Sequence, residues 1–530
     1  MINKILNDSG IEFLLNNKKY LKIFDIGFSF VSHQFTKHKY SVDMQDFNVS
    51  FFNMPEITSL KLNDVEYDSY FISLTGFDIE ISENIFKYNF SDNESLFSVH
   101  RFRWLLIGIE DFQNKEFAKK SISILNYWID NFNTVGRIVN ETYSICERLL
   151  NILYFISIVK ENDIKIYEMI NIEKLEKIYK LQIVDILSNI EYHGKYTNNH
   201  ILNNARALYI LGQVFSIDFV SITGYKLLEN QYDVHIKEGV LQEGSFHYQV
   251  LITRTILEIY NISIQMEDKV MQLFLKNRLN MILSITQSLH SEFSSLYPLV
   301  GDVSPDFPVE FFHGFPFSKK NDSSKWNNIF NIKITDFECL ESKYKFWKKF
   351  IFDKIEIWII DKKFAALDHS HNDNGSFIIF YKGKPIIYDI GRFNYDRKNI
   401  YNFMLGQSSH NGIVHNIDFP RTSVFYKYFN KISDVKITEN ENIVNVMIED
   451  VFLQKKYCYN LIINSNFVSI DTQEDLNLFC NPTSICDEMI NFDDFKININ
   501  HHNLTFSSCI MSLNYGKLND IVKIEAINND

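Results

Sequence analysis

Three histidines and one aspartate in the second half of the chain have the types and spacing of a metal site. His369 and His371 are separated by one residue. Asp389 follows eighteen residues after His371, and His410 comes twenty-one residues later. If these segments are strands, side chains two residues apart point to the same face and neighbouring strands bring the other ligands alongside. Nitrogen and oxygen ligands with one open position suit zinc, and one histidine would remain for proton transfer. The alternative is a set of surface histidines without a functional role.

Three polar segments in the first half could supply further site residues. Thr197–Leu202 precedes a predicted helix, Glu243–Gln249 opens another with Arg254 behind it, and Gly301–Pro308 is a loop stiffened by two prolines. Each has an ordinary structural explanation: helix caps in the first two segments, and aspartates that bind backbone amides in the third. The functional alternative is a cluster of amide, imidazole and guanidinium groups that would hold a carboxylate.

Composition and charge narrow the classes of protein that the chain can be. Its 530 residues allow two or three domains, and a hydrophobic content of 46% is enough for a large core. A net charge of −13 argues against a general nucleic-acid binder, which needs a basic surface. A local basic cleft for an anionic substrate is still compatible with that charge. The aromatic content of 15% also provides side chains for stacking on sugar rings.

Cysteine usage and the N-terminal residues bear on the cellular compartment. The six cysteines are scattered and form no CxxC pair, which is typical of reduced thiols in a cytosolic protein. The first residues lack a basic stretch followed by a continuous apolar one. No run of eighteen uncharged apolar residues predicts a transmembrane helix. The sequence therefore predicts a cytoplasmic protein without a membrane span, with the periplasm as the less favoured alternative.

The hydrophobic pattern divides the chain into three parts. Residues 1–95 are mixed, residues 96–325 have long helical periodicity, and residues 326–530 have short strand-like segments. Six or more consecutive helices with short connections indicate stacked helical hairpins, either a solenoid or a toroid. Several closely spaced strands indicate an antiparallel sandwich, with a hairpin turn predicted at residues 382–384. The predicted helices are 112–132, 143–158, 175–190, 203–215, 246–264 and 270–289; the predicted strands are 355–360, 376–381, 385–388, 443–448 and 466–470.

Six short motifs, in this order along the chain, resemble those of the heparinase II/III-like family, which includes heparin and alginate lyases. Their order and spacing carry the resemblance more than any single motif does. The loop with Asp302 and Asp306, together with His247 and Arg254, resembles a branch often associated with bacterial surface-polysaccharide clusters. The motifs are Asn198-Asn199-His200 (NNH), Glu238-Gly239 (DG), Glu243-x-Ser245-x-x-Tyr248 (ExSxxY), His369-x-His371-x-Asp373 (GHxHxD), Tyr388-Asp389-Ile390-Gly391 (VDPG) and Ser409-His410-Asn411 (HN).

The resemblance implies a multidomain α+β fold. An N-terminal (α/α) toroid of helical hairpins would be followed by a C-terminal antiparallel β-sandwich, with a substrate cleft between them. A metal, commonly zinc although another divalent metal would fit, would be held by His371, Asp389 and His410. This metal would be structural, holding the segment that presents His369. The expected partner is an acidic polysaccharide or oligosaccharide.

The implied reaction is β-elimination at a uronic acid, in which the C5 proton is removed and the C4–O glycosidic bond breaks. The enolate-like intermediate needs preorganised donors. Asn199 and His200 would therefore hold the carboxylate of the sugar, with Arg254 as a helper.

Elimination also needs a base and an acid. His369 would be the base, because the unperturbed pKa of histidine lies near neutrality. Tyr248 falls on the family's catalytic tyrosine and would protonate the leaving oxygen, with Tyr395 as the alternative.

Three residues depart from the family pattern without removing a proposed catalytic group. Glu238 replaces the aspartate of DG, Asp368 replaces the glycine before the first histidine, and Ile390 replaces the proline of VDPG. Asp368 places a charge beside the proposed base.

Two other functions compete with a lyase. The first is a non-lyase accessory or processing protein of capsule or O-antigen assembly, which would bind the glycan through the same cleft; the missing export signal favours it. The second is a zinc hydrolase, because a three-ligand site with an open position can activate water. The absence of a nearby glutamate base disfavours the hydrolase.

Overall fold

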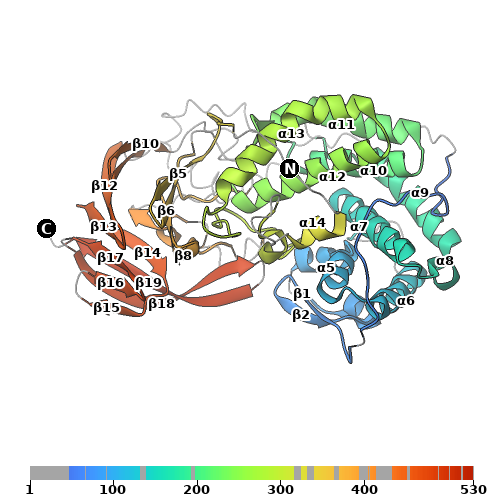
Figure 1. The fold of residues 1–530 in the computed structure, drawn as a ribbon, viewed down its shortest axis with the longest axis horizontal. Helices are drawn as coiled ribbons and strands as arrows, with labels where there is room; N and C mark the ends of the chain where they lie inside the picture. Colours follow the sequence, from blue (N-terminus) through green and yellow to red (C-terminus); the bar gives the residue numbers. More distant parts are fainter. Residues whose placement is uncertain are drawn as a thin grey trace, which may run out of the picture.

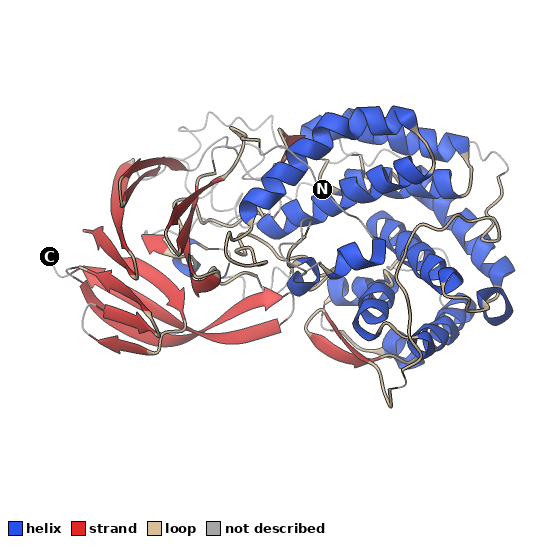
Figure 2. Ribbon diagram, in the orientation of Figure 1, coloured by secondary structure: helices blue, strands red, loops and turns tan. Residues whose placement is uncertain are grey.

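The computed structural model describes residues 47–530, and the chain is helical first and strand-rich second, as predicted (Figures 1 and 2). The described part lacks residues 1–46, about half of the mixed segment 1–95, and part of the polar stretch near residue 320 where the domain boundary is predicted. Asp368, one of the three departures from the family pattern, also lies outside the described residues. The gaps within the described range are 66, 91, 132–138, 193–196, 316–323, 331–339, 363–368, 393–394, 396–403, 405, 414–432, 451–453, 487–488, 501, 515–516 and 529–530.

The helical half consists of consecutive helices joined by short loops, with two small strand pairs. The helices are α4 (Asn93–His100), α5 (Arg103–Phe112), α6 (Lys115–Asn131), α7 (Thr142–Glu161), α8 (Ile166–Met169), α9 (Ile172–Ser188), α10 (His200–Val214), α11 (Asp218–His235), α12 (Phe246–Gln265), α13 (Lys269–Leu289) and α14 (Lys325–Phe330). The strand pairs are β1 (Phe71–Leu74) with β2 (Phe77–Glu80), and β3 (Ile236–Lys237) with β4 (Val240–Leu241).

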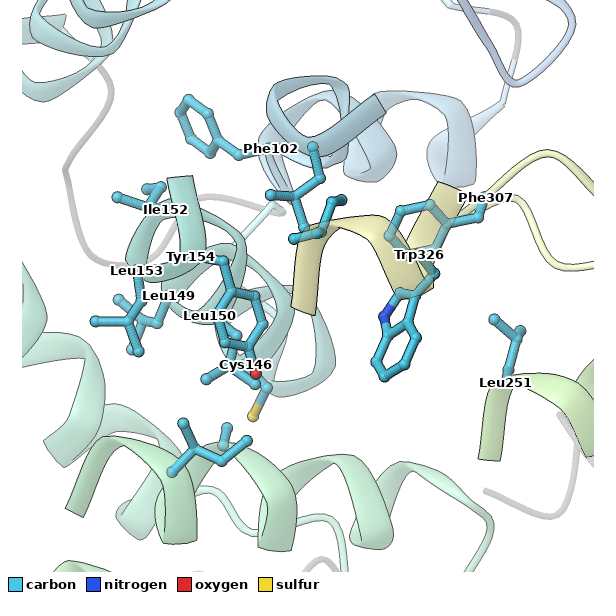
Figure 3. Close-up of a cluster of buried hydrophobic side chains, with 14 of the residues drawn as sticks. Phe102, Cys146, Leu149, Leu150, Ile152, Leu153, Tyr154, Leu251, Phe307 and Trp326 are labelled. Carbon is cyan, nitrogen blue, oxygen red and sulfur yellow. The ribbon is translucent and has the colours of Figure 1, made fainter. Parts of the chain in front are cut away.

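Helix α7 lies at the centre of this half. It begins after Glu141, whose carboxylate accepts a hydrogen bond from the backbone of Ser144. The helix is long and apolar enough to cross a membrane, but 94% of its most apolar window is buried inside the fold. In Figure 3, Leu150 of α7 belongs to the same apolar cluster as Trp326 of α14 and Leu251 of α12. A helix that is buried on all sides belongs in the core of a large protein, and the buried Glu147 of α7 is paired with Arg103.

Helices α10 and α11 form a tightly packed hairpin. A side-chain carbon at Gly212 would clash with the backbone of Ser221, and one at Gly224 would clash with the backbone of Tyr209. Small residues at these two contacts therefore let the helix backbones approach closely. Such hairpins are the repeating unit that the sequence predicts.

The strand-rich half contains two large sheets. The first has the order β10 (Ser433–Asn440), β11 (Ile443–Asp450), β12 (Lys455–Asn464), β13 (Phe467–Thr472), β17 (Phe495–Ile499), β16 (Met489–Phe492) and β15 (Ser484–Cys486). The second has the order β18 (His502–Asn514), β19 (Lys517–Asn528), β14 (Leu476–Cys480), β8 (Lys384–Ile387), β7 (Phe377–Tyr381), β6 (Ile355–Ile360) and β5 (Trp347–Phe352), with β9 (Gly412–Ile413) beside β14. These pairs are antiparallel except β13 with β17, which is parallel.

The second sheet is the layer that joins the two halves. Strand β6 is buried along its whole length. Ile357 and Ile359 pack between the two sheets, whereas Trp358 and Ile360 belong to the core of the helical half. Loops at the end of this sheet consequently lie against the helices. The predicted turn after β7 is also present, with left-handed φ values of 52° at Lys382 and 75° at Gly383.

The segment with His369 and His371 differs from the strand considered in the sequence analysis. Residues 369–376 form a loop, and β7 begins only at Phe377. The residues Asn372-Asp373-Asn374-Gly375 favour a turn, and Gly375 has a φ of 81°. Lys362 holds this loop by pairing with Asp373 and donating to Ser370 Oγ at 2.7 Å.

Candidate functional site

Two loops from different halves of the molecule meet at the candidate site. The backbone N–H of Asp302 donates to the carbonyl oxygen of His369 at 2.8 Å. Gly301 has a φ of 74°, and a Cβ there would lie 2.5 Å from the carbonyl oxygen of His369 and 2.7 Å from that of Gly244. A side chain at residue 301 would therefore separate three segments that the site needs together.

The carboxylate of Asp302 is the centre of the site. It is completely buried and lies 3.0 Å from Nδ1 of His369, 2.9 Å from Nε2 of His371 and 2.9 Å from Nη1 of Arg392. Burial alone would raise the pKa of this carboxyl group, but Arg392 and the two histidines hold it well below its usual range. Asp302 is therefore an anion that accepts hydrogen bonds from two histidines at once.

Two tyrosines lie against His369. The ring of Tyr248 stacks on His369 with a centroid distance of 3.6 Å and an angle of 12° between the planes. The hydroxyl of Tyr248 lies 2.7 Å from the hydroxyl of Tyr395. The hydroxyl of Tyr395 in turn donates to the carbonyl oxygen of Val303 at 3.2 Å. Burial raises the pKa of Tyr248 and of Tyr395 well above the ordinary value. Both phenols therefore keep their protons at neutral pH.

Helix α12 presents Tyr248 because of its N-terminal cap. Ser245 accepts a hydrogen bond from the backbone N–H of Tyr248, and its hydroxyl donates to the carbonyl oxygen of Asp302 at 2.7 Å. The cap thus ties the first turn of the helix to the loop that carries Asp302. The serine and tyrosine of the ExSxxY motif act here as one structural unit.

Glu243 connects Asn199 to the same place. Its carboxylate accepts from the backbone N–H of Asn199 at 3.1 Å and from the side-chain amide at 2.8 Å. One of its oxygens is 3.7 Å from Nε2 of His369, which is beyond hydrogen-bond distance. Glu243 therefore positions the amide of Asn199 near the face of His369 that points away from Asp302.

His200 faces another direction, although it follows Asn199 directly. Its Nδ1 lies 3.0 Å from the carboxylate of Glu191, its ring contacts Tyr143, and about a third of its side chain is exposed (34%). Burial would lower the pKa of His200, but Glu191 more than offsets this and raises the pKa to about 9. Glu141, Glu191 and His200 also form a group that could place three ligand atoms within 4.8 Å of one another.

The structure places Arg254 away from the other predicted residues. Its guanidinium is buried and lies 3.3 Å from Glu147 and 3.6 Å from Glu258. Its ring contact is with Phe307. No contact with His369 or the tyrosines is among those that the described residues make. Arg254 thus belongs to an internal ion-pair network of the helical half.

His371, Asp389 and His410 are brought together as predicted for metal ligands. All three are buried, and each can place a ligand atom within 4.8 Å of the others. Nδ1 of His410 is 2.8 Å from Asp389, while Nδ1 of His371 and Nε2 of His410 have no hydrogen-bond partner among the described residues. Buried polar atoms without partners are costly. Two imidazoles and a carboxylate are a donor set that zinc accepts, so these residues fit a divalent metal.

The other motif residues hold the loops of this site. The backbone N–H of Gly391 donates to Asp389 at 2.9 Å, and Asn411 donates to the carbonyl oxygen of Tyr388. Ile390, which replaces the family proline, is fully buried in a small apolar cluster. Glu238 pairs with Ser342 and is half-exposed. Neither replacement removes a contact described above.

Sequence reasoning missed three residues of the site. Asp302 was assigned a loop-forming role, Glu243 a helix cap, and Arg392 no role. Their partners are distant in sequence: His369 is 67 residues from Asp302, and Asn199 is 44 residues from Glu243. The signals that could have found them are the ExSxxY motif for Glu243 and the glycine–aspartate pair for Asp302.

Comparisons with known proteins agree with this architecture. A search of curated proteins finds no match. The family model described as heparinase II/III-like, C-terminal, matches residues 362–445, which include His369, His371, Asp389 and His410. A solved structure of heparinase III has a TM-score of 0.55 at 12% identity, over 99% of this chain and 90% of that chain. The heparinase III BT4657 gene product has a TM-score of 0.50 at 16% identity, over 83% of this chain and 77% of that one.

These findings identify the fold. The chain has the (α/α) toroid followed by an antiparallel β-sandwich that the sequence predicts. Residues 362–445 are similar to the C-terminal part of the heparinase II/III-like family. At these identities, the solved structures support the fold and not a particular substrate.

Proposed function

We propose that the protein is a polysaccharide lyase that cleaves a uronic-acid glycan by β-elimination. The observation that carries the proposal is the stacked pair of His369 and Tyr248, with Tyr395 at the hydroxyl of Tyr248. A base and a proton-bearing acid held together on one side of the site are what elimination requires. The match of residues 362–445 to the heparinase II/III-like C-terminal model and the names of the two similar structures, both heparinase III, support the same class of reaction.

In this proposal His369 removes the C5 proton. Asp302 accepts a hydrogen bond from Nδ1, which leaves Nε2 as the atom that takes the proton. Asn199 is held near that face by Glu243, and its amide would stabilise the carboxylate of the sugar as charge develops. His200 would approach the same carboxylate only if the sugar extends toward Glu191.

Tyr248 would then protonate the leaving oxygen. Its hydroxyl carries a proton at neutral pH, because burial keeps the pKa well above the ordinary value. The C5 proton ends on His369, the proton of Tyr248 ends on the new hydroxyl, and the C4–O bond electrons leave with that oxygen. A double bond forms between C4 and C5, and solvent restores both side chains.

The metal, when bound, would supply rigidity to the loops that carry the base. His371, Asp389 and His410 would hold it, and His371 shares Asp302 with His369. No proton transfer in the proposed reaction uses it.

The test is the ultraviolet absorbance of unsaturated uronates during incubation with uronate polysaccharides. The panel contains heparan sulfate, hyaluronan, chondroitin, alginate and a bacterial capsule polysaccharide. We expect absorbance to rise with at least one glycan and to stay flat with His369→Ala. A flat trace with every glycan, combined with measurable glycan binding, would instead support an accessory protein of surface-polysaccharide assembly.

A further inference from the structure

We propose that Asp302 is a positioning residue that couples the metal site to His369 and determines which ring nitrogen of His369 carries the proton. The inference rests on the proposed function only in naming His369 as the base. The coupling itself is a property of two histidines, one carboxylate and the bound metal.

A single carboxylate, that of Asp302, lies between two imidazoles. Oδ1 of Asp302 is 2.9 Å from Nε2 of His371, and Oδ2 is 3.0 Å from Nδ1 of His369. Arg392 donates to Oδ2 at 2.9 Å and so favours the ionised form. An ionised carboxylate only accepts hydrogen bonds. Both facing ring nitrogens must therefore carry hydrogen.

One ring nitrogen of each histidine does not face Asp302: Nδ1 of His371 and Nε2 of His369. In a neutral imidazole only one nitrogen carries hydrogen. His371 then has a lone pair on Nδ1, a buried atom near Asp389 and His410 that has no hydrogen-bond partner in the part of the chain that the structure describes. His369 has a lone pair on Nε2, the atom a base needs. One carboxylate thus selects a ligand tautomer on one side and a base tautomer on the other.

Backbone hydrogen bonds fix the position of Asp302, so its carboxylate contacts both histidines at once. Its backbone N–H donates to the carbonyl oxygen of His369, and its own carbonyl oxygen accepts from Ser245. Gly301 beside it lets the backbones of Gly244 and His369 approach closely, because it has no side chain. Binding of a metal by Nδ1 of His371 fixes the proton on Nε2, so it strengthens the hydrogen bond to Asp302. Carboxylates that orient metal-bound histidines in this way typically contribute 10- to 100-fold in metal affinity.

The Asp302→Asn variant separates this role from a merely structural one. The amide has the same shape, but one of its two polar atoms is a donor. That donor faces either His369 or His371 and forces the hydrogen on that ring to the other nitrogen. A variant of this kind should fold, yet lose metal affinity, the base tautomer, or both.

The experiment uses full-length protein with histidines labelled with ¹⁵N in the ring. His369→Gln and His371→Gln assign the signals. In zinc-loaded wild type we expect His369 to have a protonated Nδ1 and an unprotonated Nε2. In Asp302→Asn we expect a changed tautomer at one of the two histidines and a zinc dissociation constant, measured by chelator competition, at least about 10-fold weaker.

Activity supplies a second measurement once a cleaved glycan is known. With saturating zinc, Asp302→Asn should lower kcat by up to about 10⁴-fold, the size of effect seen when a histidine-orienting carboxylate becomes an amide, with KM within about threefold of the wild type. Glu310→Gln is the matched control, because it removes a carboxylate just beyond the same loop and outside the site. This variant should leave kcat and KM unchanged. Wild-type kcat, zinc affinity and tautomers in Asp302→Asn would overturn the proposal.

The wild-type protein gives a test that no folding defect can obscure. Removal of zinc by a chelator should shift the ring signals of His369, although His369 is not a ligand. Unchanged His369 signals would also overturn the coupling. Failure to cleave any glycan would count against the proposed lyase, whereas the spectra and zinc affinities would still decide the role of Asp302.

Discussion

Asp302 and Asp306 lie four residues apart in one loop, and both are buried anions, but their neighbours differ. Asp302 faces His369 and His371 from the strand-rich half. Asp306 lies 2.7 Å from Arg101 and 2.7 Å from Arg103 of the helical half. Arginine keeps its proton at any ordinary pH, whereas histidine exchanges protons near neutrality. The same side chain therefore stabilises the fold at one position and can support chemistry at the other.

The surroundings of Asp306 extend this contrast. Arg103 also pairs with Glu147, which in turn pairs with Arg206 and Arg254. All of these side chains are buried, so loss of one partner leaves an uncompensated charge in the core. The loop between the two aspartates is thus anchored at one end by a rigid network. That anchor lets the other end hold histidines in a defined geometry.

The largest effect should come from the histidine side of the comparison. His369→Ala removes the proposed base and should lower kcat by up to about 10⁴-fold, because that is the upper range for general base catalysis. The melting temperature should stay close to that of the wild type. His502→Gln is the control: this buried histidine of the sandwich bonds to the backbone carbonyl oxygens of Asn500 and Glu474 and should keep full activity. Retained activity in His369→Ala would refute its role as base.

On the arginine side of the comparison, we expect a substitution to lower the stability of the fold. Asp306→Ala leaves Arg101 and Arg103 without this partner and should lower the free energy of unfolding by about 3–5 kcal/mol, measured by urea denaturation. Glu168→Ala breaks only an exposed pair with Lys165 and should cost about 0.5 kcal/mol or less. A stability loss for Asp306→Ala no larger than this control would contradict the comparison.

The pH dependence of the Asp306 contribution has a definite sign. Burial alone would raise the pKa of Asp306, but Arg103 and Arg101 more than offset this and lower it. Stability from such a group is fully present above its unfolded-state pKa of about 4 and is lost as pH falls through the lower folded value. The stability difference between wild type and Asp306→Ala should therefore be constant from pH 5 to neutrality and shrink only in more acidic solution.

A smaller effect on catalysis is expected at the tyrosines. Tyr248→Phe keeps the ring that stacks on His369 but removes the proton donor, so kcat should fall by about 10²-fold or more with little change in stability. Tyr395→Phe removes only the partner of that hydroxyl and should have the milder effect. The reverse order would assign the acid role to Tyr395.

The smallest effect is expected at His200, a histidine of the helical half that pairs with Glu191. Its pKa of about 9 depends on Glu191, so the pair contributes to stability below the ordinary histidine pKa of about 6.5 and is lost as pH rises through 9. The ring of His200, followed by NMR, should titrate near pH 9 in the wild type and at a clearly lower pH in Glu191→Gln. An unchanged midpoint would show that the pair does not govern His200.

The sequence was most informative where one element buries a continuous face. The predicted helices 246–264 and 270–289 correspond to α12 (Phe246–Gln265) and α13 (Lys269–Leu289), and the predicted strand 355–360 corresponds to β6. Helix α11 (Asp218–His235) was not predicted, because its apolar positions are fewer and more exposed. The strand considered for His369 and His371 is instead a loop, because the turn-forming residues after them outweigh the alternation.

Within the site, residue types and order determined the candidates, and contacts decided their roles. His369, Tyr248 and Asn199 were predicted and converge, whereas Arg254 is engaged by Glu147 in the core. A guanidinium on a helix can face a cleft or the interior, and local periodicity does not distinguish the two. Helices α7 and α12 both pack against α10, and this arrangement places Glu147 within 3.3 Å of Arg254.

By itself, then, the sequence determined the helix-then-strand architecture, the family motifs and the set of histidines and carboxylates that could bind a metal. Local propensity and spacing suffice for these features, because each depends on residues close in the chain. Only the tertiary structure decided that Asp302, and not Asp306, lies between the two histidines. The direction of a loop side chain depends on what approaches the loop from elsewhere, and here the approaching segment lies 67 residues further along the chain.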